Sequence, residues 1–174
     1  VSLGDFYVSR REPERAIGHY EIALRLAPDS IPALVNASLA YNTVGRNEKA
    51  EDSLQRALTV EPSSYPANLN LGLLLAEMGR NQEAETVLRA AAKSDPQSAA
   101  AAYNLGVLLS DSRPEEALIW CRKAAALRPQ EPKYAYTLAF YERRRGNLKR
   151  AIQLLHDLIR RHSAYEDGYR LLAD

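Results

Sequence analysis

The feature that most constrains this sequence is a repeat of about 34 residues. Pro28, Pro62, Pro96 and Pro129 are separated by 34, 34 and 33 residues, and the next interval of 34 reaches Ser163. Side chains that recur at one fixed period are typical of repeat proteins, in which each unit is a small supersecondary element that stacks on its neighbours. The chain of 174 residues therefore has room for about five such units.

Small and apolar residues recur in step with the prolines. Three columns of the repeat hold Ala16, Ala50, Ala84, Ala117 and Ala151; Tyr20, Leu54, Leu88, Cys121 and Leu155; and Ala23, Ala57, Ala91, Ala124 and Leu158. A fourth column holds Tyr7, Tyr41, Leu75, Leu109 and Glu142, of which Glu142 is the one misfit. This recurrence predicts that the same packing contacts are made in every unit.

Each unit contains two runs of apolar residues at helical spacing, separated by a short turn. The turns are Gly45-Arg46-Asn47, Gly79-Arg80-Asn81, Ser112-Arg113-Pro114 and Gly146-Asn147. Glycine suits the left-handed conformation that ends a helix, and the proline after the second run cannot continue one. Each unit is therefore predicted to be a helical hairpin.

The sequence resembles the tetratricopeptide repeat family. The resemblance is carried by Leu3-Gly4…Tyr7…Ala16…Tyr20…Ala23…Pro28 and again by Leu71-Gly72…Ala84…Leu88…Ala91…Pro96. It implies an all-α fold, a right-handed superhelical solenoid of antiparallel helix pairs. Cys121 at an aromatic position, Leu158 at a small one and Ser163 at a proline depart from the pattern.

The phase of the repeat predicts a single array over residues 1–174. Its expected units are 1–30 as a partial repeat, 31–64, 65–98, 99–131, 132–165 and the start of a further repeat at 166–174. Both ends fall within a unit, so we expect the array to be truncated and the parent chain to continue beyond Asp174.

Composition excludes several classes of function. The chain has 23 Lys+Arg against 22 Asp+Glu, too even a balance for a sequence-independent nucleic-acid binder. No stretch approaches the ~20 consecutive apolar residues of a membrane span, so we expect a soluble chain without membrane insertion. The compartment stays open between the cytoplasm and the bacterial periplasm.

Few residues suggest catalysis or cofactor binding. His19, His156 and His162 accompany no nucleophile–base pair and no metal-ligand spacing. Cys121 lies in a packing column, which predicts a buried small hydrophobe rather than a reactive thiol. We therefore expect no enzyme activity, no cofactor and no metal.

The resemblance implies that the first helices of the units line a concave face that binds peptide segments. Counted from the start of each unit, the fifth and ninth residues on this face are Val35 and Leu39, Leu69 and Leu73, Tyr103 and Val107, and Tyr136 and Phe140. They form an apolar stripe that either binds a peptide or packs against the neighbouring second helices.

Polar residues complete the predicted site. Asn36, Asn70 and Asn104 occupy the same place in three consecutive units, and a row of amides can pair with the backbone of an extended peptide. Residues 132–174 carry nine Lys+Arg against five Asp+Glu, so acidic ligand residues are expected to approach Lys133, Arg143 and Arg144. Arg143 and Arg144 also suit a purely structural role, because cations stabilise the end of a helix.

Three functions follow from these features. The first is a non-catalytic scaffold that binds a protein or peptide partner in a concave groove. The second is a structural protein that self-assembles into homo-oligomers through its exposed repeat edges. The third is the repeat portion of a larger bacterial enzyme or multihaem cytochrome, because Pro132-Lys133-Tyr134-Ala135-Tyr136 is similar to repeat tails of exported multihaem cytochromes, although no Cys-x-x-Cys-His motif is present.

Overall fold

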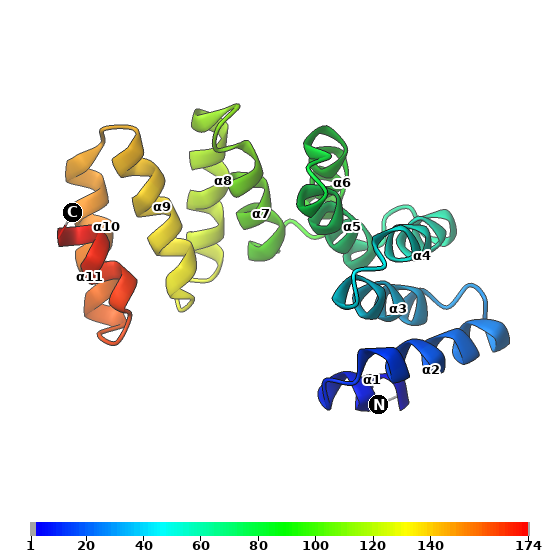
Figure 1. The fold of residues 1–174 in the computed structure, drawn as a ribbon. Coiled ribbons are helices and arrows are strands. Elements are labelled where there is room, and N and C mark those ends of the chain that lie inside the picture. The colour runs from blue at the N-terminus through cyan, green and yellow to red at the C-terminus, as the bar shows by residue number, and fades with distance from the viewer. Residues whose placement is uncertain (1–2, 174) are drawn as a thin grey trace. The chain divides into compact units, whose positions relative to one another are not determined.

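The computed structural model describes residues 3–173, and over this range the chain forms α-helices and no strand (Figure 1). The helices are α1 (Leu3–Ser9), α2 (Pro13–Leu26), α3 (Ile31–Thr43), α4 (Asn47–Val60), α5 (Tyr65–Glu77), α6 (Asn81–Ser94), α7 (Ala99–Leu109), α8 (Pro114–Leu127), α9 (Pro132–Arg144), α10 (Leu148–Arg161) and α11 (Glu166–Ala173). The predicted all-α architecture of helix pairs is confirmed. Residues 1, 2 and 174, at the outer edges of the predicted first and last repeats, lie outside the described residues.

The helices belong to two compact units, the first ending at Asp95 and the second beginning at Pro96. In the first unit, α1 pairs with α2, α3 with α4 and α5 with α6; in the second, α7 pairs with α8 and α9 with α10. Each hairpin also packs on the next one in its unit, through α2 on α3, α4 on α5, α8 on α9 and α10 on α11. First helices of successive hairpins meet as well, at α3 with α5 and at α9 with α11.

The turns within the hairpins have the predicted conformations. Gly45, Gly79 and Gly146 have φ angles of 74°, 75° and 81°, in the left-handed region that ends a helix. The turn between α7 and α8 has no glycine, and α8 begins instead at Pro114, whose missing N–H is not needed in a first turn. The first hairpin has Arg11 at φ 60° where three of the others have glycine, an uncommon conformation for a residue with a side chain.

The core consists of the predicted columns. The small column is at most 2% exposed at every position: Ala16, Ala50, Ala84, Ala117 and Ala151. Glycine in the first helices permits the closest approach, since a Cβ added to Gly106 would lie 2.4 Å from Cys121 Sγ and 3.1 Å from the Cys121 backbone nitrogen. The hairpins are therefore held together by helix–helix contacts that leave no room for larger side chains.

Glu142, the misfit of the repeat, lies inside the second unit with only 3% of its surface exposed. Its Oε1 accepts a hydrogen bond from Arg122 at 3.0 Å, and its Oε2 accepts one from Asn147 at 2.8 Å. Arg122 belongs to α8, and Asn147 precedes α10. The buried carboxylate of α9 thus connects α8, α9 and the turn before α10. The other units have a tyrosine or leucine at this position.

Among residues 3–173, no helix combines the length and the apolar character required to cross a membrane.

Candidate functional site

The predicted apolar stripe is divided by the structure into a packed column and an exposed one. In the fifth position of the units, Val35 is buried, and Leu69, Tyr103 and Tyr136 are half-buried. In the ninth position, Leu39, Val107 and Phe140 expose 47%, 39% and 40% of their surface, and Leu73 is half-buried. Packing therefore occupies the fifth position, and the ninth position presents apolar side chains to solvent.

Leu39 borders an apolar pocket in the first unit. The pocket has a volume of about 330 Å³ and is lined by Val8, Arg11, Pro13, Leu39, Ala40 and Thr43. That volume is at the lower end of the ~300–1,000 Å³ range of ligand pockets. Val8 is also half-exposed, at 49%, so the walls offer unburied apolar surface to an incoming side chain.

Arg11 places a positive charge at this pocket. Its left-handed backbone closes α1, because its N–H donates to the Val8 carbonyl at 2.9 Å and the N–H of Glu12 donates to the Tyr7 carbonyl at 2.9 Å. Such a conformation costs about 1–3 kcal/mol in a non-glycine residue. The pocket therefore combines an apolar interior with a guanidinium group on a constrained turn.

The three predicted amides are half-buried, and each already makes a hydrogen bond within the protein. Asn36 Nδ2 donates to Asp5 at 3.0 Å, Asn70 Nδ2 to the Pro66 carbonyl at 2.8 Å and Asn104 Nδ2 to the Ala100 carbonyl at 2.9 Å. One bond uses one of the two N–H groups of an amide, and the side-chain oxygen is a further acceptor. Each amide therefore has one N–H group left for a peptide instead of two. Peptide contact by this row stays a prediction.

Asn36 is part of a network that sequence reasoning missed. The Asp5 carboxylate of α1 accepts hydrogen bonds from Asn36 of α3 and, at 2.7 Å, from the Tyr20 hydroxyl of α2. Burial and this carboxylate raise the pKa of Tyr20 well above its ordinary value, so the phenol remains a donor. The network fixes three helices beside the pocket.

In the second unit the predicted residues lie among aromatic rings. Lys133 Nζ is 5.7 Å from the ring centre of Tyr103 and 5.0 Å from that of Tyr134, in cation–π geometry. Tyr136 contacts Tyr165 edge to face at 5.9 Å. The cation predicted for acidic ligands therefore also stabilises the packing of α7 on α9.

Two arginines at the end of α9 form ion pairs within the second unit. Arg144 forms an ion pair with Asp111 at 2.8 Å, and Arg145 forms one with Glu115. Both acids belong to the preceding hairpin, around the turn between α7 and α8. Arg143 is half-buried. The ion pair of Arg144 is exposed on both sides, at 57% and 80%, so contact of this arginine with acidic ligand residues stays a prediction.

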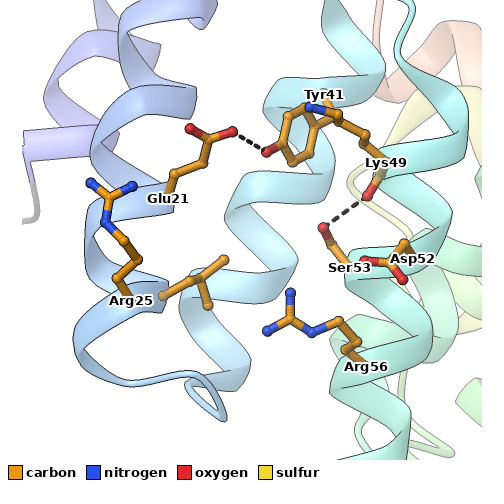
Figure 2. Close-up of a pocket in the computed structure, with 8 residues that line it drawn as sticks. Glu21, Arg25, Tyr41, Lys49, Asp52, Ser53 and Arg56 are labelled. Carbon is orange, nitrogen blue, oxygen red and sulfur yellow. Dashed lines mark hydrogen bonds between the residues drawn. The ribbon is translucent and has the colours of Figure 1, made fainter.

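Sequence reasoning also missed a charged pocket on the second-helix side of the first unit. Figure 2 shows it, with a volume of about 390 Å³, lined by Glu21, Leu24, Arg25, Tyr41, Lys49, Asp52, Ser53 and Arg56. The Tyr41 hydroxyl donates to Glu21 at 2.7 Å, and Arg56 donates to the Pro28 carbonyl at 3.3 Å. Burial and the bond to Glu21 raise the pKa of Tyr41 to about 12. Its mixed charges come from outward positions of two different repeats, where no single motif marks them.

Within the described residues 3–173, no group of three or more His, Cys, Asp or Glu residues is placed to hold a metal ion. Cys121 is 1% exposed, which confirms the predicted packing role, and burial raises the pKa of its thiol from 9.0 to about 12.

The buried thiol predicts a pH dependence of stability. The unfolded chain releases the Cys121 proton above about pH 9, whereas the folded chain retains it to about pH 12, so stability falls as pH rises through this window. We expect a loss of about 1 kcal/mol between about pH 8 and pH 10 that is absent in Cys121→Ala. Urea unfolding at the two pH values measures it, and equal pH dependence in both proteins would contradict it.

These features agree with the comparisons to known proteins. One model of the tetratricopeptide repeat matches residues 34–98 and 69–132, and another matches residues 1–30. The chain belongs to the tetratricopeptide repeat family. Comparison with curated protein sequences gives no match.

Three solved structures with the same fold share only 20–23% sequence identity with this chain. MamA of Desulfovibrio magneticus RS-1 is 23% identical, with a TM-score of 0.82 over 94% of this chain and 93% of that one. The Pseudomonas aeruginosa protein pilF is 23% identical, with a TM-score of 0.84 over 91% of this chain and 73% of that one. YrrB, a TPR protein with an unusual peptide-binding site, is 20% identical, with a TM-score of 0.76 over 97% and 87%. Together they show the tetratricopeptide repeat fold.

Proposed function

We propose that this chain is a non-catalytic interaction scaffold that binds a peptide segment of a partner protein on its first helices. The observation that carries the proposal is the exposed ninth-position column, with Leu39 at an apolar pocket. Isolated exposed apolar side chains are common on protein surfaces, but Leu39 lines a pocket together with Val8, Pro13 and Ala40, and concave apolar sites are typical of ligand binding. The peptide-binding site of the similar protein YrrB is consistent with this use of the fold.

The energetics require several contacts. Full burial of one leucine-sized side chain contributes about 1.5–3 kcal/mol, and a neutral hydrogen bond about 0.5–1.5 kcal/mol. A micromolar complex needs about 8 kcal/mol, which is more than a single apolar anchor provides. In the first unit, a peptide with one side chain in the pocket therefore extends toward Asn70 and Leu73 on α5, the helix that packs next to α3.

A selected peptide and two matched substitutions test the proposal. Peptides are selected from a displayed random library on the purified chain, and their affinities are measured by fluorescence anisotropy. Leu39→Ser should weaken peptides held by the first unit about tenfold or more, because the exposed leucine contributes apolar contact. Val60→Ser is the control, since Val60 of α4 is 45% exposed, close to the 47% of Leu39.

The second unit offers the same comparison. Phe140→Ser should weaken the peptides that the second unit holds, and Ile119→Ser, at a residue of α8 with 62% exposure, should not. Peptides whose affinity is unaffected by both Leu39→Ser and Phe140→Ser would show that the ninth-position column is not the binding surface.

A further inference from the structure

A second surface of unusual composition lies on α8 and α10 in the second unit. Leu148 and Ile152 are one helical turn apart on α10 and expose 56% and 46% of their surface. Ile119 of α8 exposes 62%. These side chains belong to second helices, so they form no part of the ninth-position column.

Cations border this apolar surface. A pocket of about 800 Å³ is lined by Arg122, Glu142, Gly146, Asn147, Leu148, Lys149 and Arg150. Its three cations face one acid, and both oxygens of that acid are occupied by Arg122 and Asn147. The second helices α2, α4, α6 and α8 have glutamate in their first turn, whereas α10 has Lys149 and Arg150 there.

We propose that this basic groove, lined by Arg122, Leu148, Lys149 and Arg150, with Ile152 one helical turn beyond Leu148, docks an acidic segment of a partner protein. Charge complementarity identifies the occupant. From residue 96 onward the chain has 13 Lys+Arg against nine Asp+Glu, and the groove concentrates part of that surplus beside exposed leucine and isoleucine. In an acidic segment with an apolar side chain between its carboxylates, the carboxylates can pair with the cations of the groove and the apolar side chain can contact its exposed apolar residues.

The packing of α10 favours a protein segment over a lipid surface. A helix that lies in a membrane interface inserts its whole apolar face into the lipid. On α10 that face is already used, because Ala151, Leu155 and Leu158 are at most 3% exposed and belong to the core. Leu148 and Ile152 remain exposed beside the pocket. Two such side chains can contact one apolar side chain of a bound peptide.

Fluorescence anisotropy with a defined probe tests the docking. The probe is a fluorescein-labelled peptide of four Asp-Glu-Leu repeats, and its neutral counterpart has four Asn-Gln-Leu repeats. The full chain should bind the acidic peptide about tenfold more tightly than the neutral one, and added salt should weaken binding. Lys149→Glu combined with Arg150→Glu should reduce the affinity for the acidic peptide about tenfold.

The matched control reverses two charges at the other end of the same helix. Arg160→Glu combined with Arg161→Glu changes the net charge equally, about 16 Å along α10, and should alter the affinity less than about twofold. Circular dichroism checks that both double variants keep the wild-type helix content. Leu39→Ser and Phe140→Ser should leave binding of the acidic peptide unchanged, which separates this groove from the ninth-position column.

Each other outcome overturns the proposal. Equal affinity for the two peptides, or equal weakening by the two double variants, would show that no specific acidic site exists. Capture on phosphatidylglycerol vesicles without binding of the acidic peptide would assign the surface to lipid. Concentration-dependent sedimentation that Lys149→Glu with Arg150→Glu abolishes, again without peptide binding, would assign it to a second copy of the chain.

Discussion

Replacing Gly106 with alanine should destabilise the α7–α8 hairpin by about 1–3 kcal/mol. The added Cβ would lie 2.4 Å from Cys121 Sγ, 3.1 Å from the Cys121 nitrogen and 3.2 Å from the Ala117 carbonyl oxygen. The severe contact is with the Cys121 side chain, which is 1% exposed and has little room to rotate. The two backbone contacts require α7 and α8 to shift by a few tenths of an ångström as well.

Trp120, the one tryptophan of the chain, lies on α8 and reports this change locally. Urea unfolding followed by its fluorescence should show a lower midpoint for Gly106→Ala. Gly18→Ala is the control, because nothing lies within 4 Å of the added Cβ and alanine is favoured over glycine within a helix by about 0.5–1 kcal/mol. A wild-type midpoint for Gly106→Ala would mean that the hairpin does not depend on this close approach.

Replacing Glu142 with glutamine should destabilise the second unit by about 1–3 kcal/mol. The carboxylate accepts from Arg122 and from Asn147, and both partners are donors. A glutamine amide would turn its NH₂ group toward one of them and lose that bond inside the protein. Arg122 is 55% exposed on its side chain, so solvent screening keeps the cost below that of a fully buried ion pair.

Leucine at position 142 is the informative comparison. The same column holds Leu75 and Leu109, which are 3% and 1% exposed, so Glu142→Leu restores the side chain that other units bury there. Leucine removes only the acid of this pair, but Arg122 and Asn147 are exposed and can bond to water instead, so no buried charge is left unpaired and we expect a change within about 1 kcal/mol. Both variants are measured by urea unfolding, and a larger loss for leucine than for glutamine would contradict this account of Glu142.

The periodic residues predicted the hairpins correctly because they act through packing, which repeats with the sequence. Helices α2, α4, α6 and α8 end at or just before the proline column, and Gly45 and Gly146 end first helices as expected. Backbone preferences of glycine and proline are local, so they can be inferred from a single sequence.

The polar contacts were less predictable because they join residues of different repeats. Asn36 pairs with Asp5, 31 residues away, and Arg144 pairs with Asp111, 33 residues away. Such partners depend on the stacking offset between hairpins and on side-chain rotamers, neither of which the repeat pattern specifies. The fifth position is buried or half-buried and the ninth is exposed except at Leu73, and this difference depends on the same offset.

Hydroxyl-radical footprinting with the tightest selected peptide tests the central claim most directly, since it measures the solvent accessibility of individual side chains. The claim is that the ninth-position side chains of the first helices are the binding surface. Bound peptide should reduce labelling at Leu39 or at Phe140, according to the unit that holds it, and leave Ile22 and Val60 at their free levels. Loss of labelling at Ile22 or Val60, with Leu39 and Phe140 unchanged, would contradict it.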